Sequence, residues 1–222
     1  MIVSMWMTRD VTTIGPDAPV AEAAALMARA HIRRLPVVER SGKEVRLLGI
    51  VSATDILHAF PPDVNPFAVE GPDARQTPLT AGDIMHRQLE TTTPDTPIEE
   101  AAAMMCDQKI GALPVLRDGK LVGIITESDI FRAFVSLVAS AGDGARITFD
   151  MSKGEDIFGF ITQAAKQNRV RVVSLLSAQQ GERPVCVVRV AGDRVEKFLD
   201  ELWASGHLVL NVLRFPLKSP EP

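Results

Sequence analysis

The chain repeats one pattern of residues twice, and no other feature of the sequence limits its possible folds as much. The matched positions are Met7 and Met85, Leu35-Pro36-Val37 and Leu113-Pro114-Val115, and residues 49–56 and 123–130. The offset is 78 residues for the first two pairs and 74 for the last. The first copy therefore carries four extra residues, within a polar stretch where a loop tolerates added length. Two such copies can pack about a pseudo-twofold axis and form two related clefts.

Both copies have the same predicted order of elements. A short strand and a Pro-Asp pair come first, followed by an Ala-rich helix, a strand-turn-strand and a second helix. The expected segments are 11–14, 20–30, 35–38, 47–51 and 54–60 in the first copy, and 89–92, 98–109, 113–116, 121–125 and 128–138 in the second. The turn of the second copy contains Asp118-Gly119 between two apolar runs, which is a strong signal for a hairpin.

The rest of the chain divides into a connector and a further domain. Residues 61–78 contain five prolines, so they cannot form a regular helix. After a flexible break at 140–144, strands and helices follow in the order βαββαβ, which is a ferredoxin-like unit. The predicted domains are the first repeat at 1–60, the connector at 61–82, the second repeat at 83–139, the βαββαβ unit at 145–216 and a tail at 217–222.

Charge and composition argue against several classes of protein. The formal net charge of −4 disfavours broad nucleic-acid binding, which needs clustered cations. No stretch approaches the roughly 20 apolar residues of a membrane span, and the N-terminus lacks the apolar core of a signal peptide. Cys106 and Cys186 lie far apart and are interpreted as small buried apolar residues in a reducing compartment. The predicted location is therefore cytoplasmic, with neither a nucleic acid nor a membrane as a partner.

The repeated motif G-[IV]-[IV]-[ST]-x-x-D-I, together with the upstream Leu-Pro-Val, resembles the CBS domain. Two such domains in tandem resemble a CBS pair, or Bateman module. The βαββαβ unit resembles an ACT domain in its order of elements, and the whole arrangement is similar to CBS-ACT proteins of the acetoin-utilisation type. The resemblance implies an α/β (α+β) fold, in which a tandem CBS pair with pseudo-twofold symmetry precedes a ferredoxin-like ACT-type domain.

Hydroxyls and a carboxylate recur where the last strand of each copy meets its second helix. These residues are Ser52, Thr54 and Asp55 in the first copy, and Thr126, Ser128 and Asp129 in the second. A helix N-terminus favours anions, because it carries free N–H groups and the positive end of the helix dipole. The residues can be helix caps alone, or can bind a ribose through the carboxylate and a phosphate through the hydroxyls. The resemblance to CBS domains implies the second interpretation.

Arg33 and Arg34 directly precede the Leu-Pro-Val of the first copy. Two adjacent guanidinium groups suit a phosphate, because Arg forms planar bidentate hydrogen bonds. A solvated basic turn is the alternative. The corresponding residues of the second copy are Gly111 and Ala112. The sequence therefore predicts unequal pockets, one well supplied for phosphate and one suited to an uncharged adenosyl group or to no ligand.

The resemblance also implies contacts to an adenine base. Thr13 and Thr91 would lie on the strand edge that frames the base, with ordinary strand positions as the alternative. The Leu-Pro pairs would supply apolar contacts. The predicted ligand-binding residues are therefore Thr13, Arg33, Arg34, Leu35, Pro36, Ser52, Thr54, Asp55, Thr91, Ala112, Leu113, Pro114, Thr126, Ser128 and Asp129.

The predicted function is regulation rather than catalysis. The sequence contains no legible acid/base set, nucleophile-base pair, zinc-ligand spacing or P-loop, so neither an enzyme nor a metal or catalytic cofactor is expected. The expected regulatory ligand is AMP, ADP, ATP or S-adenosylmethionine, bound between the repeats. The ACT-like domain or a homodimer would relay the signal that the ligand has bound. The alternatives are an oligomerising scaffold without nucleotide binding, and an amino-acid sensor that uses the ACT-like domain.

Overall fold

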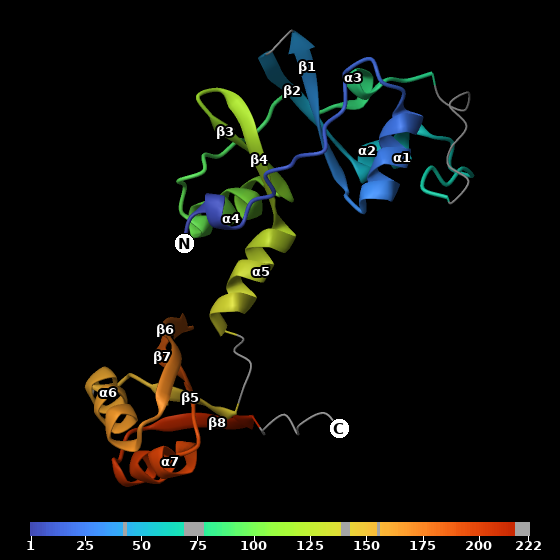
Figure 1. Cartoon of the computed structure of the whole chain (residues 1–222). Helices are drawn as coiled ribbons and strands as arrows, with labels where there is room; N and C mark the ends of the chain where they lie inside the picture. Colours follow the sequence, from blue (N-terminus) through green and yellow to red (C-terminus); the bar gives the residue numbers. More distant parts are fainter. Residues whose placement is uncertain (42–43, 69–77, 139–142, 155, 216–222) are drawn as a thin grey trace. The chain divides into compact units, whose positions relative to one another are not determined.

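The computed structural model describes residues 1–41, 44–68, 78–138, 143–154 and 156–215 (Figure 1). The chain forms two compact units, Met1–Ala133 and Phe134–Pro222. The first unit contains both copies of the repeat, and the second contains the βαββαβ segment. Most of the predicted break after the second copy, and the predicted tail, lie outside the described residues.

Each copy of the repeat consists of a helix, a β-hairpin and a second helix. The first copy contains α1 (Val20–Ala30), β1 (Arg34–Ser41), β2 (Glu44–Ser52) and α2 (Ala53–Ala59). The second copy contains α4 (Ile98–Gln108), β3 (Ala112–Arg117), β4 (Lys120–Thr126) and α5 (Glu127–Val138). The 3-10 turn η1 (Val3–Met5) and the short helix α3 (Ala81–Ile84) are not predicted from the sequence. The mixed α/β fold class agrees with the prediction.

The Ala-rich helices α1 and α4 end in the same way. The residue after the last turn, His31 or Lys109, has a left-handed backbone with φ of 52° or 54°. In the first copy, the N–H of Ile32 then donates to the carbonyl of Met27 at 3.0 Å. This pattern satisfies carbonyls that the helix leaves free at its end. The chain therefore turns sharply and passes through residues 33 and 34 directly into the hairpin.

The strands predicted at 11–14 and 89–92 are not regular strands. Each segment instead forms one isolated parallel bridge, between Ile14 and Val37 and between Thr92 and Val115. A continued parallel ladder would need an N–H from Pro36 or Pro114, and proline has none. The proline of each Leu-Pro-Val therefore limits the pairing to a single bridge.

The segment that leads into each copy packs on the other copy. The N-terminal arm lies beside α4 (Figure 1), where Thr8 bridges to Ile124 and Val3 joins the core of the second copy. His86, at the start of the second copy, bridges in the same way to Ile50 of the first. The two copies therefore exchange their arms, and the cavities between them are built from both.

Gly49 and Gly123 of the repeated motif lie where these arms cross the hairpins. A Cβ added to Gly49 would lie 2.7 Å from the carbonyl oxygen of His86, and one added to Gly123 would lie 3.0 Å from that of Thr8. A side chain at either position would therefore push against the backbone of the arm. The exchange of arms thus explains the glycine of the motif.

The second unit is a four-stranded antiparallel sheet with two helices. Its elements are β5 (Gly144–Asp150), α6 (Ile157–Asn168), β6 (Arg171–Gln180), β7 (Arg183–Ala191), α7 (Val195–Ala204) and β8 (Val209–Phe215). The strand order β6-β7-β5-β8 is that of a ferredoxin-like unit, so the predicted fold is confirmed. Phe149, Ile161 and Phe198 form the centre of its core.

The two cysteines lie in different environments. Cys186 is buried in the core of the second unit, and burial raises the pKa of its thiol. Cys106 is exposed, because α4 turns Ala101 and Met105 toward the core instead. The expectation that both cysteines are buried is therefore wrong for Cys106.

Candidate functional site

A capping box begins the second helix of each copy. In the first copy, the N–H and hydroxyl of Ser52 donate to Asp55 Oδ2 at 2.7 and 2.6 Å, and the Asp55 N–H donates to Ser52 Oγ at 3.2 Å. In the second copy, Thr126 and Asp129 form the same bonds at 2.8, 2.7 and 3.4 Å. Both pairs therefore cap their helices, and capping uses only one oxygen of each carboxylate.

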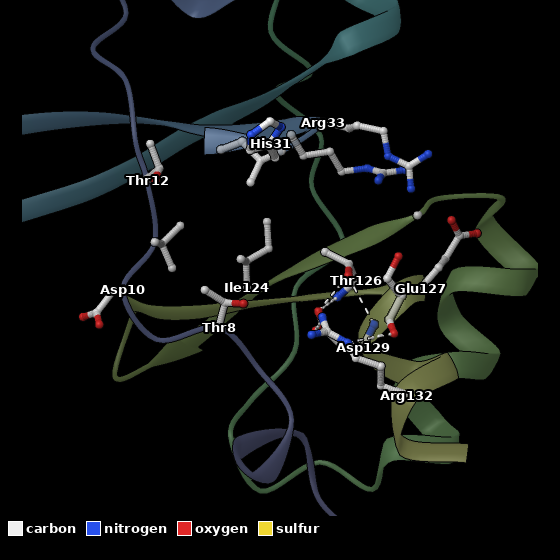
Figure 2. A pocket seen from close by; sticks show the side chains of 15 residues that line it. Thr8, Asp10, Thr12, His31, Arg33, Ile124, Thr126, Glu127, Asp129 and Arg132 are labelled. Carbon is white, nitrogen blue, oxygen red and sulfur yellow. Dashed lines mark hydrogen bonds and ion pairs between the residues drawn. The ribbon is translucent and has the colours of Figure 1, made fainter. Parts of the chain in front are cut away.

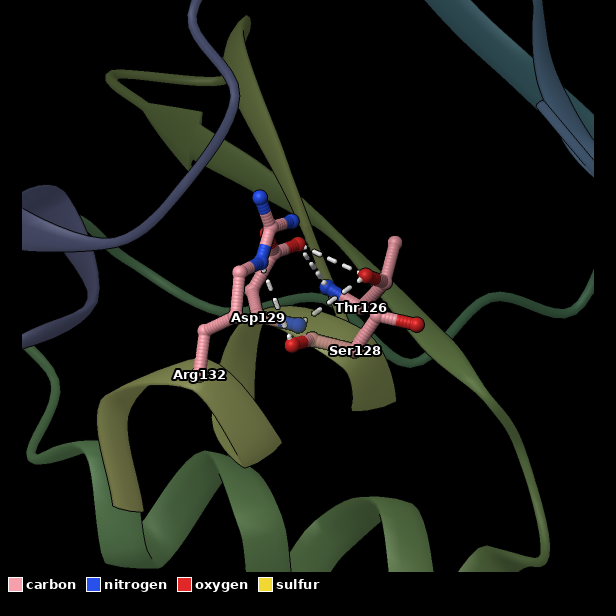
Figure 3. Close-up of polar contacts among 4 residues, drawn as sticks. All are labelled: Thr126, Ser128, Asp129 and Arg132. Carbon is pink, nitrogen blue, oxygen red and sulfur yellow. Dashed lines mark hydrogen bonds and ion pairs between the residues drawn. The ribbon is translucent and has the colours of Figure 1, made fainter. Parts of the chain in front are cut away.

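The other carboxylate oxygen of each pair meets a basic side chain. Arg132, one turn further along α5, donates to Asp129 Oδ1 and forms an ion pair with it (Figure 3). In the first copy, His86 Nε2 lies 3.0 Å from Asp55 Oδ1. Burial raises the pKa of the Asp55 carboxyl, but hydrogen bonds from Ser52 and His86 outweigh burial and hold the pKa below its ordinary value. Oδ1 is thus the atom of each carboxylate that can exchange its partner for a ligand.

Pocket A is a cavity of about 250 Å³ between the two copies (Figure 2). Arg33 and Arg34 of the first copy line it together with Thr126, Ser128 and Asp129 of the second. The arginine pair of one copy therefore shares a cavity with the carboxylate of the other. The sequence alone does not say which carboxylate the arginines accompany.

Pocket B, of about 510 Å³, is the pseudo-equivalent cavity. Its lining includes Ser52 and His86, and from the second copy Lys109, Ala112 and Pro114. Lys109 corresponds to His31 of pocket A by the offset of 78 residues. Arg34 lines pocket B as well as pocket A, so pocket B has more basic groups than the sequence predicts.

The other predicted residues are outside the described linings of both pockets. They are Thr13, Leu35, Pro36, Thr54, Asp55, Thr91 and Leu113. Leu35 and Leu113 are fully buried in the cores of their copies. Asp55 is connected to pocket B through its bonds to Ser52 and His86. Thr12 lines pocket A and Glu90 lines pocket B, each one position before the predicted threonine.

Both pockets contain polar residues that are not predicted from the sequence. They are Thr8, Asp10, Thr12, His31, Glu127 and Arg132 in pocket A, and His86, Gln88, Glu90, Gln108 and Lys109 in pocket B. Arg132 could have been predicted from the sequence, because residues three apart on a helix lie on the same face and Asp129 was already a candidate. Thr8 and His86 could not, since they reach the pockets only through the exchange of arms.

The described part of the chain contains neither a metal site nor a membrane-spanning helix. No group of His, Cys, Asp and Glu side chains there can hold a metal ion. No helix among those residues is long and apolar enough to cross a membrane. The polar groups around pockets A and B are hydroxyls, carboxylates, amides and basic side chains.

Comparison with protein-family models matches the CBS domain at residues 3–62 and 81–136. The chain belongs to the CBS domain family. The two matches fall on the two copies of the repeat, which are therefore the first and second CBS copies. The ACT assignment of the second unit rests on its order of elements and stays a prediction.

Two solved structures resemble the chain in sequence and fold. One is a candidate acetoin utilization protein (AcuB) from Vibrio cholerae, with 30% identity and a TM-score of 0.51, covering 62% of this chain and 93% of that one. The other is protein MJ1225 from Methanocaldococcus jannaschii, a proposed archaeal homologue of g-AMPK. It has 31% identity and a TM-score of 0.50, and the match covers 60% of this chain and 47% of MJ1225.

Curated relatives match over the CBS copies as well. CBS domain-containing protein YhcV from Bacillus subtilis is 30% identical over 124 residues, which are 56% of this chain and 79% of YhcV. The chain spans about half the length of MJ1225, at 47%, and 23% of another relative. The similarity therefore concerns the CBS module, and not the whole of those longer proteins.

Proposed function

We propose that the chain is a regulatory module that binds an adenosine-containing nucleotide between its CBS copies. The observation that carries this proposal is the composition of pocket A. It combines Arg33 and Arg34 with the Thr126–Asp129 capping box, so that basic groups for a phosphate stand in one cavity with a carboxylate for a ribose. AMP, ADP, ATP and S-adenosylmethionine all contain the adenosyl group that such a site would take.

The proposed roles follow from the bonds that each group has left to make. Asp129 Oδ2 stays in the helix cap, while Oδ1 exchanges Arg132 for the ribose hydroxyls. Arg132 is then free to join Arg33 and Arg34 at the phosphate. Arg suits this role, because its planar fork pairs with phosphate oxygens through two parallel hydrogen bonds.

The proposal agrees with what the relatives are named for. MJ1225 is described as a proposed archaeal homologue of g-AMPK. In this chain the second unit, which is ferredoxin-like and similar to an ACT domain, would relay the bound state to a partner. A cytoplasmic location stays a prediction, and the resemblance to proteins of the acetoin-utilisation type assigns no activity to this chain.

The signal would also pass through a homodimer. Phe131 and Phe134 on α5 are 72% and 57% exposed, and Leu57, which corresponds to Phe131 in the first copy, is 49% exposed. Large exposed apolar side chains of this kind are typical of protein–protein interfaces, and a second copy of the chain would bury them. Sedimentation velocity would give a dimer; a monomer at all concentrations would contradict this part of the proposal.

The test is thermal unfolding of the full chain with AMP, ADP, ATP, S-adenosylmethionine or NAD. A ligand at a hundred times its Kd should stabilise the protein by about 2.7 kcal/mol. Asp129→Ala should abolish the shift from pocket A, and Asp55→Ala should reduce any shift from pocket B. Asp83→Ala is the matched control, since Asp83 forms the same kind of capping box in α3 but lines neither described pocket.

One outcome would contradict the proposal, and another would contradict the role given to Asp129. If none of the five compounds shifts the transition, the scaffold alternative is favoured, and amino acids should be tested next at the second unit. If Asp83→Ala removes the shift as fully as Asp129→Ala, the loss reflects helix capping rather than ligand contact.

A further inference from the structure

Arg34 lies in the wall between the two pockets. Its side chain lines pocket A together with Arg33, and it also lines pocket B together with Lys109. Gly111 is likewise part of both linings. Arg33, in contrast, lines pocket A and not pocket B in the described part of the chain. The two neighbouring arginines are therefore in different positions with respect to the second cavity.

Gly111 leaves the space that Arg34 occupies. A Cβ built on Gly111 would overlap Arg34 Nη2 and would lie 2.7 Å from both Arg34 Cζ and Glu127 Oε2. The guanidinium and the Glu127 carboxylate therefore both lie close to Gly111. By the offset of 78 residues, Gly111 is the counterpart of Arg33. The second copy therefore has no side chain at the position of Arg33, and Arg34 of the first copy, whose own counterpart is Ala112, occupies the space that Gly111 leaves.

The Arg34 guanidinium is partly desolvated and weakly held. Burial lowers its pKa, and the attraction of Glu127 only partly opposes this effect. No hydrogen bond fixes the guanidinium among the residues that the structure describes. A phosphate in either pocket would supply the bonds that it lacks.

We infer that two phosphorylated ligands compete for Arg34, so that pockets A and B bind such ligands with negative cooperativity. This inference rests on the proposed function. One guanidinium cannot pair bidentately with phosphates in two cavities, so the ligand that binds first takes it. The second phosphate then meets a pocket that has lost a cation. Adenosine makes no demand on Arg34, so its binding in one pocket is independent of a phosphate in the other.

The size of the coupling follows from the bond that is lost. A hydrogen bond to a charged group is worth about a tenfold change in affinity or more. The second AMP should therefore bind at least about tenfold more weakly than AMP binds to the same pocket when the other is empty. Because coupling between two sites is reciprocal, AMP affinity falls by the same factor whichever pocket is filled first.

The experiment is calorimetric titration of the full chain with AMP and, separately, with adenosine. Ser128→Trp blocks pocket A from an exposed position, and its remaining site reports on pocket B alone. That site should bind AMP about tenfold more tightly than the second site of the unmodified chain. Adding Arg34→Gln to Ser128→Trp should remove this gain, whereas adding Arg33→Gln should leave it intact. Adenosine affinities should agree within about twofold throughout.

The outcomes separate this inference from the proposed function. If AMP binds but Ser128→Trp does not tighten pocket B, or if Arg33→Gln acts like Arg34→Gln, negative coupling through Arg34 is wrong and nucleotide binding stands. If the unmodified chain binds neither AMP nor adenosine, the proposed function fails and the inference fails with it. Should Ser128→Trp not fold, the ratio of the two AMP affinities in Arg34→Gln alone decides, and an unchanged ratio overturns the coupling.

Discussion

In the first CBS copy the free oxygen of Asp55 meets His86, which arrives from the arm of the other copy. In the second copy the free oxygen of Asp129 meets Arg132, which belongs to the same helix as the carboxylate. The backbone pattern, the capping box and the glycine of the motif are the same in both. The difference shows that the two copies share the frame of each pocket, while the basic partner of the carboxylate differs between them in residue type and in the segment that supplies it.

The largest expected effect on ligand binding comes from replacing Arg33 and Arg34, the two arginines that the first copy contributes to pocket A. Arg33→Gln/Arg34→Gln should weaken AMP binding by about 100-fold, because two charge-assisted hydrogen bonds of at least about 1.5 kcal/mol each are lost. Adenosine, which has no phosphate, should lose less than about threefold. Calorimetric titration with both compounds measures the contrast.

A matched double variant controls for the loss of two positive charges. Arg40→Gln/Arg46→Gln removes two arginines from the β1–β2 hairpin that line neither described pocket, and should leave AMP affinity within about threefold. An equal loss of AMP and adenosine binding in the first double variant would sink the assignment of the arginines to phosphate.

The next effect concerns the places where the arms cross the hairpins. The distance from the glycine's added Cβ to the carbonyl oxygen of the arm differs there by a few tenths of an ångström between the copies. Gly49→Ala should destabilise the chain by about 1–3 kcal/mol, because its Cβ would lie 2.7 Å from the His86 carbonyl oxygen. Gly123→Ala should cost less, since the corresponding distance to the Thr8 carbonyl oxygen is 3.0 Å. Denaturant unfolding compares the two. Gly15→Ala, with nothing within 4 Å, is the control, and equal costs at all three sites would refute the packing argument.

Local patterns made the helices predictable, and contacts between the copies made the pockets less so. The helix expected at 20–30 is observed as α1, because its alanines and its entry at Pro19 act within a few residues. The strand expected at 11–14 does not form, because Pro36 of its partner strand has no N–H to donate to it. Contacts of that kind depend on which segments meet in space.

The candidate site shows the same division. Ser52, Asp55, Thr126 and Asp129 were predicted as ligand contacts from their own motif, with helix caps as the alternative. The structure shows the caps, and ligand binding by these residues stays a prediction. The presence of Arg34 and the Asp129 of the other copy in one pocket was not predictable, because it depends on how the two copies pack together. The roles of Glu127 and Gly111 were not predictable either, because they depend on the Arg34 guanidinium that lies close to Gly111.

The smallest effect distinguishes the histidine of the first copy from the arginine of the second. Since the folded pKa of Asp55 lies below the unfolded value of about 3.9, its ionised form stabilises the fold at neutral pH. This contribution is fully present above the unfolded pKa and is lost as the pH falls through the folded pKa. Asp55→Asn should therefore flatten the decline in denaturant midpoint between about pH 5 and pH 2. His86→Gln, which removes one of the bonds that lower the pKa, should move the decline to higher pH. The effect is modest because Asp55 is partly solvated and screened, and a profile that neither variant changes would show that His86 does not hold this carboxylate.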